Sequence, residues 1–191
     1  MCSVELLSNV DLNSVTNQNI FVDTNVLLWA FYPNLVSKSQ NYSIYANALF
    51  GLINGHNNIY VLGNNLSEFV YVIEKTELCI YRKLKGLSKT FRLKDFRKIS
   101  DERVKVQSVT QLALEQIFNI PEIKIVGCSN DPISIKNFIN SYNSQQFDYY
   151  DYLTAQQCLK LSGVIITDDI DYKYSNLDLH IYTENSNYFG D

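Results

Sequence analysis

The chain reads IFVDTN at residues 20–25, an apolar run that leads directly into an acid and two polar residues. The run favours a buried strand, and Asp23 with its two neighbours favours the start of a helix. A second apolar run, VII at residues 164–166, leads into TDDID at residues 167–171. The carboxyl ends of parallel strands form the crevice in which open α/β sheets bind ligands. Both acidic groups are therefore expected at one site.

Strand and helix patterns alternate along the rest of the chain, which predicts a parallel sheet with helices on both faces. Further strands are predicted at Ile59–Leu62, at Ile123–Val126 and, as an edge strand, at His180–Tyr182. Helices are predicted from Asp23 to Pro33, across 42–53, from Leu66 onward, across 101–119, after Asp131 and across 148–161. Residues 82–100 are ambiguous and are predicted to be helix plus loop.

Length and composition restrict the class of protein. The chain has 191 residues, enough for one domain, and 46% are hydrophobic, which excludes global disorder. No apolar run approaches the roughly 20 residues that span a bilayer, and no secretory signal pattern begins the chain, so we expect a cytoplasmic protein with no membrane partner. The four cysteines and two histidines are scattered. They predict neither a zinc site nor disulfides, and the cysteines are expected to be small buried hydrophobes.

Two more acids stand at predicted helix starts. Glu68 opens a helix, where an acid also stabilises the macrodipole, so a purely structural role is an alternative. Asp151 shares a helix face with the small residues at 155, 158 and 162, a stripe that is expected to pack on the sheet. Asp148 is expected to cap this helix and to leave Asp151 for a ligand, although the two could exchange roles. Asp23 has the same structural alternative, that of a helix cap.

The acids together predict a site for a hard metal ion. Oxygen ligands without a histidine or cysteine cluster favour Mg²⁺ or Mn²⁺ over zinc. Asp168, Asp169 and Asp171 place several like charges at one strand end, which raises carboxyl pKa values unless a cation is present. Such a site suits hydrolysis of phosphodiester bonds. Neither a nucleophile triad nor a glycine-rich phosphate-binding motif occurs in the chain.

The order and spacing of these acidic motifs resemble those of PIN-domain ribonucleases, which include the VapC-type toxins of toxin–antitoxin pairs. The resemblance implies a three-layer α/β/α domain over residues 1–191, with an N-terminal extension at 1–19 and a basic helical insertion at about 82–120. It implies Mg²⁺- or Mn²⁺-dependent cleavage of RNA, a protein inhibitor (antitoxin) and a homodimer. The implied acidic set is Asp23, Glu68, Asp151 and Asp169, with Asp171 as an auxiliary acid and Thr24, Asn25 and Thr167 in supporting contacts. Asp168 and Tyr152 depart from the family pattern, which commonly has small residues at these positions.

Basic residues are concentrated between residues 75 and 105, a stretch that holds 11 of the 16 Lys and Arg residues and only four acids. Such a stretch predicts contact with a polyanion, and a solvated helical face is the alternative. The residues predicted to contact RNA are Arg82, Lys83, Lys85, Lys89, Arg92, Lys94, Arg97 and Lys98. Tyr81, Phe91 and Phe96 are predicted to stack on bases.

Three functions compete on the sequence alone. The first is a Mg²⁺-dependent endoribonuclease. The second is a catalytically weak PIN-type module that binds nucleic acid in an RNA-processing complex through the basic stretch. The third is a receiver-type phosphoacceptor, which also has acidic strand ends, but the sequence lacks a lysine after a late strand to complete that site.

Overall fold

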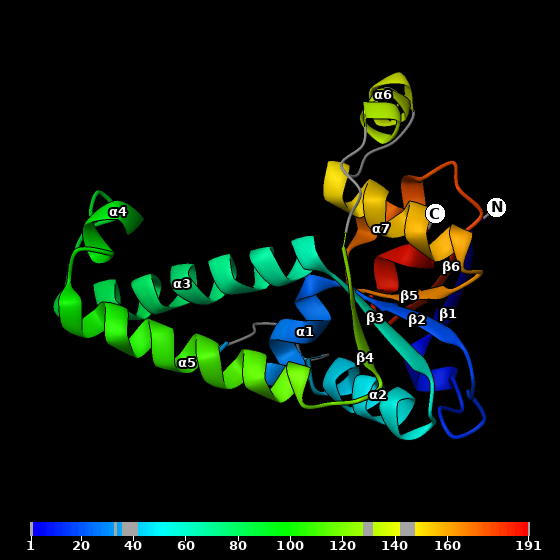
Figure 1. The fold of residues 1–191 in the computed structure, drawn as a ribbon, viewed down its shortest axis with the longest axis horizontal. Helices are drawn as coiled ribbons and strands as arrows, with labels where there is room; N and C mark the ends of the chain where they lie inside the picture. The colour runs from blue at the N-terminus through cyan, green and yellow to red at the C-terminus, as the bar shows by residue number, and fades with distance from the viewer. Residues whose placement is uncertain (1, 33, 36–41, 128–131, 142–147, 191) are drawn as a thin grey trace.

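The computed structural model describes residues 2–32, 34–35, 42–127, 132–141 and 148–190. Figure 1 shows a sheet with helices on both sides and two long helices that extend away from it as an arm. The strands are β1 (Ser3–Leu6), β2 (Asn19–Val22), β3 (Asn58–Leu62), β4 (Ile123–Val126), β5 (Val164–Ile166) and β6 (His180–Thr183). The helices are α1 (Thr24–Phe31), α2 (Tyr42–Asn54), α3 (Gly63–Lys85), α4 (Leu93–Phe96), α5 (Ser100–Phe118), α6 (Pro132–Ser141) and α7 (Tyr149–Lys160). Short 3₁₀ helices follow as η1 (Leu7–Asn9), η3 (Ile170–Tyr174) and η4 (Ser186–Tyr188).

The six strands form one sheet in the order β1-β6-β5-β2-β3-β4, and every neighbouring pair is parallel. The chain moves from β2 to β3 on one side, whereas β5 lies on the other side of β2. The sheet therefore has its topological switch point at β2 and β5, where open α/β sheets form their ligand crevice. In the β2–β5 register Val22 lies opposite Ile166, so Asp23 and Thr167 follow side by side.

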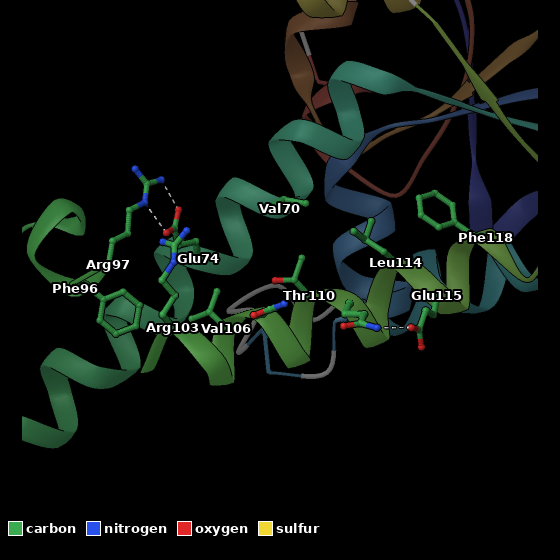
Figure 2. Close-up of a pocket in the computed structure, with 12 residues that line it drawn as sticks. Val70, Glu74, Phe96, Arg97, Arg103, Val106, Thr110, Leu114, Glu115 and Phe118 are labelled. Atoms are coloured by element: carbon green, nitrogen blue, oxygen red, sulfur yellow. Dashed lines mark hydrogen bonds and ion pairs between the residues drawn. The ribbon is translucent and has the colours of Figure 1, made fainter. Parts of the chain in front are cut away.

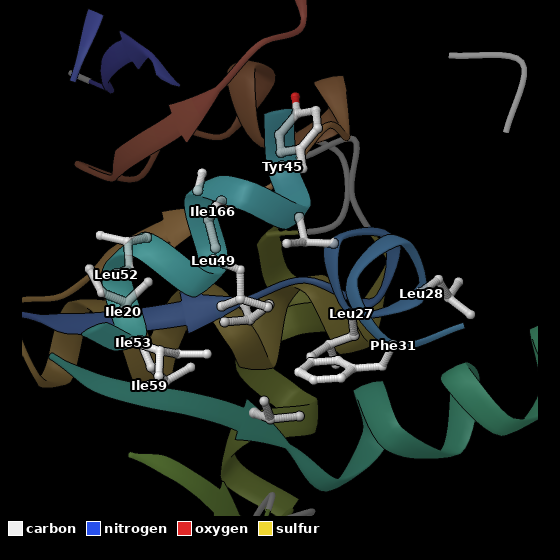
Figure 3. Close-up of a cluster of buried hydrophobic side chains, with 14 of the residues drawn as sticks. Ile20, Leu27, Leu28, Phe31, Tyr45, Leu49, Leu52, Ile53, Ile59 and Ile166 are labelled. Carbon is white, nitrogen blue, oxygen red and sulfur yellow. The ribbon is translucent and has the colours of Figure 1, made fainter. Parts of the chain in front are cut away.

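Alternation along the central strands divides the apolar side chains between two cores. Ile20 and Val22 of β2 enter the core beneath α1 and α2, whereas Phe21 enters the core beneath α7. In β5, Ile166 likewise enters the first core and Ile165 the second. Figure 3 shows the first core, where side chains of α1 and α2 cover β2 and β3. The predicted three-layer α/β/α architecture is confirmed.

The N-terminal residues, expected as an extension, contribute to the sheet. β1 pairs in parallel with β6, with Val4 opposite Ile181, and Leu7 and Val15 are buried in the first core. β1 therefore takes the edge, and the prediction that residues 180–182 form an edge strand is wrong. The polar residues between these apolar side chains conceal the strand pattern in the sequence.

Helix α3 begins earlier than predicted. It starts at Gly63 directly after β3, so Glu68 lies in its second turn and not in its first. The polar residues that suggested a turn are helical, and the Nδ2 of buried Asn65 donates to the carbonyl oxygen of Val22 (3.2 Å). The Asn65 hydrogen bond therefore attaches the first turn of α3 to the end of β2, where an apolar contact would be expected from the helical pattern. The Asp131 cap predicted for α6 falls outside the described residues.

The arm consists of α3 and α5, which lie side by side, with α4 at its far end (Figure 1). Helix α3 ends at Gly86, whose φ of 62° is the left-handed conformation that glycine adopts readily at a helix end.

Two further observations concern hydropathy and the cysteines. No described helix meets the length and hydropathy required to cross a membrane. Cys158 is buried as predicted, but Cys79 on α3 is exposed, and Cys128 falls outside the described residues.

We predict that Ile20→Ala lowers the free energy of unfolding by about 2–5 kcal/mol, because it opens a cavity at a fully buried position of the central strand. Urea denaturation followed by circular dichroism measures the change. Val104→Ala on α5 is the control, since Val104 is 59% exposed and its truncation is expected to cost less than about 0.5 kcal/mol. Equal losses for both variants would contradict the central position of β2.

Candidate functional site

A cleft of about 830 Å³ opens at the carboxyl ends of β2 and β5, at the switch point of the sheet. Its lining comes from α1, from the first turns of α3 and α7, and from η3. All five acids predicted from the sequence line it, namely Asp23, Glu68, Asp151, Asp169 and Asp171. Thr24 and Asn25 also line it, as does Asp148. The fold thus brings together acids that lie up to 148 positions apart in the chain.

Asp23 is held in place by three hydrogen bonds. Its Oδ1 accepts from the backbone N–H of Thr24 (2.6 Å), and its Oδ2 accepts from Asn25 Nδ2 (2.8 Å) and from Thr167 Oγ1 (2.5 Å). The backbone N–H of Asp169 in turn donates to Thr167 Oγ1 (2.9 Å). The Thr167 hydroxyl therefore joins the ends of β2 and β5. Asp23 both caps α1 and faces the cleft, so the two alternatives drawn from its sequence are compatible.

Two acids on helices are each oriented by a neighbouring hydroxyl. Thr24 Oγ1 donates to Glu68 Oε2 (2.7 Å), which links α1 to α3. The hydroxyl of buried Tyr172 donates to Asp151 Oδ1 (3.1 Å), which links η3 to α7. Asp148 caps α7, where its Oδ1 accepts from the N–H of Asp151 (3.1 Å). The expected cap is therefore observed. Both acids line the cleft, so the ligand role expected for Asp151 stays a prediction.

The three acids after β5 point in different directions. Asp169 caps η3, where its Oδ1 accepts from the N–H of Asp171 (2.9 Å), and both side chains line the cleft. Asp168 is outside the cleft lining, and its Oδ1 accepts from the hydroxyl of Tyr45 (2.6 Å), which reaches up from α2. Asp168 thus serves the packing of α2 under the sheet edge. Asp168, which departs from the family pattern, thus has a hydrogen-bond partner in Tyr45.

Burial and like charge raise the pKa values of the acids in the cleft. Burial, followed by the charges of Asp169 and Glu68, raises the pKa of Asp23 to about 6, although its hydrogen bonds act in the opposite direction. Burial, followed by the charges of Asp23 and Asp148, raises the pKa of Asp151 to about 8. At pH 7 a carboxyl with a pKa of about 8 keeps its proton unless a cation replaces it, whereas one with a pKa of about 6 is mostly ionised.

The donors in the cleft are chemically suited to a hard cation. They are all oxygens, the acids repel one another, and Asn25 Oδ1 is buried with no hydrogen-bond partner among the described residues. The acids are nevertheless spread apart. Among the described residues, no three or more Asp, Glu, His or Cys side chains are close enough together to hold a metal ion. Four of the five acids instead accept hydrogen bonds from protein groups: Glu68 from Thr24, Asp23 from Thr167, Asp151 from Tyr172, and Asp169 from the backbone N–H of Asp171.

The basic stretch lies at the far end of the arm. Lys83 is 15 residues beyond Glu68 on α3, which corresponds to about 22 Å along a helix. Part of its charge is used within the arm, since Arg97 pairs with Glu74 (2.5 Å) and the Arg82 Nε donates to the carbonyl oxygen of Phe91 (2.8 Å). Seven basic residues of the stretch are exposed and form no ion pair with the described part of the chain, namely Lys75, Lys83, Lys85, Lys89, Arg92, Lys94 and Arg103.

The aromatic residues of the basic stretch form a small core at the tip of the arm. Phe96 is 2% exposed, and its ring centroid lies 5.4 Å from that of Tyr81. Phe91 packs on the same tyrosine, at 6.1 Å. The prediction that Phe96 stacks on a base is therefore wrong, because its ring is needed to pack α4 against α3. The sequence offered no means to separate an aromatic that packs locally from one that faces a ligand.

A second cavity, of about 680 Å³, lies along the arm between α3, α4 and α5. Figure 2 shows Val70, Leu114 and Phe118 near the body of the protein, and the Arg97–Glu74 pair with Phe96 toward the tip. The lining is mostly apolar and shares no residue with the acidic cleft. Its lining holds two acids, Glu74 and Glu115, whereas six acids line the cleft at the switch point.

Three residues beside the acids were not predicted from the sequence. Tyr71 and Tyr150 line the cleft, and Lys75 lies over the Tyr71 ring, with its Nζ 5.0 Å from the ring centroid. The signal was present, because Glu68, Tyr71 and Lys75 follow one another at three- and four-residue spacing and so share a face of α3. Lys75 was counted only as the first member of the basic stretch.

We predict that, without metal, Asp151→Asn raises stability at pH 8 by about 1–3 kcal/mol and changes it little at pH 5. The folded-state pKa of about 8 lies above the ordinary 3.8, so the stability that this proton contributes is complete at acid pH and is lost as pH rises toward 8. Thermal melting from pH 5 to 8 in a chelator measures the slope. Millimolar Mg²⁺ or Mn²⁺ is expected to stabilise the wild type more than the variant.

Asp101→Asn is the control for that experiment, because it removes an exposed carboxylate from the first turn of α5. Its melting curve should follow the wild type at every pH. An Asp151→Asn variant whose pH slope equals that of the wild type would show that Asp151 is ionised and well solvated in the folded protein.

Comparison with known proteins agrees with this architecture. The family model of the PIN domain matches residues 20–176. Among solved structures, the crystal structure of VapBC2 from Rickettsia felis bound to a DNA fragment from their promoter is similar, at 17% sequence identity and a TM-score of 0.51, over 86% of this chain and 98% of that chain. That likeness shows a shared fold. No curated protein sequence matches. Since the family model covers most of the chain, including all five acids of the cleft, the chain belongs to the PIN domain family.

Proposed function

We propose that the protein is a Mg²⁺- or Mn²⁺-dependent endoribonuclease. PIN domains are typically nucleases that use divalent metal ions, and this supports the general part of the assignment. The observation that carries the specific part is the convergence of five acids from four elements on one cleft at the switch point of the sheet. Hydrolysis of a phosphodiester needs a cation beside the phosphate, and this cleft is where oxygen ligands are available.

In this proposal Asp23, Glu68, Asp151 and Asp169 hold the ion and Asp171 assists. An ion held by these residues would activate a water and polarise the scissile phosphate. Thr24 and Thr167 keep the carboxylates oriented through the bonds described above. Asn25 offers its unpartnered Oδ1 to a water or a ribose hydroxyl in the cleft.

The raised pKa values of Asp23 and Asp151 make the ion compete with protons for the site. Each carboxyl releases its proton as the ion binds, so affinity for the ion is expected to rise with pH. Activity limited by ion binding should therefore increase between pH 6 and pH 8 at subsaturating Mg²⁺, and the increase should disappear at saturating Mg²⁺.

Protein partners are a further part of the proposal. The similar solved structure is that of the VapBC2 pair bound to promoter DNA, which supports control of this chain by a protein inhibitor and a dimeric state. The arm also has exposed apolar side chains, since Leu112 is 59% exposed and Phe118 is 56% exposed. Exposed apolar side chains are common on surfaces that bind another protein. Multi-angle light scattering at micromolar concentration tests the homodimer, and a monomer would count against it.

A catalytically weak binding module is the second candidate. The observation that favours it is the exposed lysines at the tip of the arm, about 22 Å from Glu68, because a positive surface so far from the acids can bind RNA without presenting it for cleavage. The nuclease and the module differ in one respect. The module binds RNA equally well with and without the acidic set, and it releases no cleavage product.

We predict that Asp23→Asn reduces Mg²⁺-dependent cleavage of a fluorescent single-stranded RNA by at least about 100-fold, because a carboxylate at the centre of the site is lost. The fold should persist, with thermal stability equal or higher, since the change also removes repulsion among the acids. Gel electrophoresis of the products with Mg²⁺, Mn²⁺, Ca²⁺ or EDTA measures cleavage. Ca²⁺ is expected to bind without supporting turnover.

Asp168→Asn is the matched control, since this acid lies next to Asp169 but bonds to Tyr45 outside the cleft. It should cut RNA within a few-fold of the wild type at temperatures well below its melting point. Cleavage by Asp23→Asn within a few-fold of the wild type at saturating Mg²⁺ would refute the metal-site assignment. A parallel DNA substrate decides whether the activity is restricted to RNA.

We predict that replacing Lys83, Lys85, Arg92 and Lys94 by glutamine weakens RNA binding alike for all sequences. If these four side chains contact phosphates, they should contribute about −3 to the slope of log K for RNA binding against log salt concentration. The variant should lose this contribution. Fluorescence anisotropy across a salt series measures it. Lys136→Gln with Lys160→Gln, two exposed lysines elsewhere, is the control. An unchanged slope would make the stretch a solvated helical surface.

A further inference from the structure

Two exposed tyrosines flank the acidic cleft from different helices. Tyr71 on α3 is 47% exposed and Tyr150 on α7 is 53% exposed, and both line the cleft together with the acids. Tyr150 is the immediate neighbour of Asp151, and Tyr71 lies one turn beyond Glu68. The two rings are therefore carried by the same helical turns that position two of the proposed metal ligands.

The two hydrophobic cores do not account for these rings, although the Tyr150 ring also contacts that of Tyr149, with centroids 6.0 Å apart. Neither hydrophobic core includes them, whereas Tyr45, Tyr152 and Tyr172 are all buried in those cores. An aromatic ring that is about half exposed at the mouth of a polar cleft keeps a face for a planar ligand. Unpaired nucleotide bases are such ligands, and each base can stack on an aromatic side chain whatever its sequence.

Lys75 adds a positive charge at the same place. Its Nζ lies over one face of the Tyr71 ring, 5.0 Å from the centroid, and Tyr71 remains 47% exposed. It is exposed and stands two turns beyond Glu68 on the same face of α3. Lys75 is seven residues from Glu68, or about 10 Å along the helix, whereas Lys83 is about 22 Å away, so Lys75 is the basic residue of the stretch nearest to Glu68 along α3.

We propose that Tyr71 and Tyr150 stack on two unpaired bases on either side of the phosphate held at the acids, and that Lys75 contacts the adjoining backbone phosphate. This inference rests on the proposed nuclease function and specifies its substrate as a single-stranded segment. In a duplex the base faces are covered by their neighbours, so the rings have nothing to stack on. The three side chains are positioning residues, since none of them contacts the proposed reacting atoms.

The cleft volume is compatible with this arrangement. About 830 Å³ falls within the roughly 300–1,000 Å³ of sites that enclose small organic ligands. Bases placed against rings on α3 and α7 would hold the backbone between them, over the carboxyl ends of β2 and β5. The protein would then discriminate little between base sequences and strongly between single-stranded and paired RNA.

Binding of short labelled RNA by fluorescence anisotropy tests the inference, with Ca²⁺ in place of Mg²⁺ to suppress cleavage. The probes are a single-stranded decamer, the same sequence in a duplex, and the decamer with one abasic position. We expect Tyr71→Ala and Tyr150→Ala each to weaken binding of the single strand about tenfold, whereas Tyr→Phe at either position stays within twofold. Duplex affinity should be low for every variant. Lys75→Gln should lower the salt dependence of binding.

Tyr174→Ala is the matched control. Tyr174 is 48% exposed and also has a lysine over its ring, with Lys173 Nζ 6.0 Å from the centroid, but it is not part of the cleft lining. Its loss should leave binding unchanged. The abasic probe should weaken binding to the wild type and have little additional effect on the tyrosine variant that contacts the missing base.

The outcomes separate the inference from the function on which it rests. If the wild type cleaves RNA but both alanine variants bind the single strand within twofold of it, stacking is overturned and the nuclease stands. Equal affinity of the wild type for single strand and duplex also overturns stacking. If the wild type binds single strands through the tyrosines but never cleaves with Mg²⁺ or Mn²⁺, the positioning role is supported and the nuclease function fails.

Discussion

The parallel pairing of β2 with β5 is the contact on which the rest of the site depends. It sets Val22 opposite Ile166, and the next residue on each strand then meets across the strand ends, where Thr167 Oγ1 donates to Asp23 Oδ2 (2.5 Å). The first residue of α1 extends the network to α3 through Glu68. A shift of one residue in the β2–β5 register would exchange the two cores and turn Asp23 away from the cleft.

The site retains a repulsion that the fold alone does not relieve. Burial and like charge raise the pKa values of Asp23 and Asp151 to about 6 and about 8, so both carboxylates are unfavourable in the absence of a cation near neutral pH. The apolar cores on both faces of the sheet hold the strand ends together against this cost. The crowding of these carboxylates thus costs stability, as is often found at functional sites, and in the proposed nuclease a bound cation would relieve this cost.

Helix α3 joins the two surfaces that the proposals assign to nucleic acid. Its first turns carry Glu68 and Tyr71 at the cleft, and its last turn carries Lys83 and Lys85 at the tip of the arm. Because these ends are far apart, the proposed function assigns encounter with a long polyanion to the tip and cleavage to the cleft. The nearby charge for the cleft is Lys75, which belongs to the middle of the same helix.

The sequence by itself determined the alternating strands and helices, the three-layer fold and the order of the acids, since periodicity and capping residues are local features. Only the tertiary structure decided which neighbours each side chain meets. It placed β1 at the edge, buried Phe96, turned Asp168 toward Tyr45 and grouped Tyr71 with Tyr150 beside the acids. These outcomes depend on contacts between residues far apart in the chain, and a local pattern carries no record of such contacts.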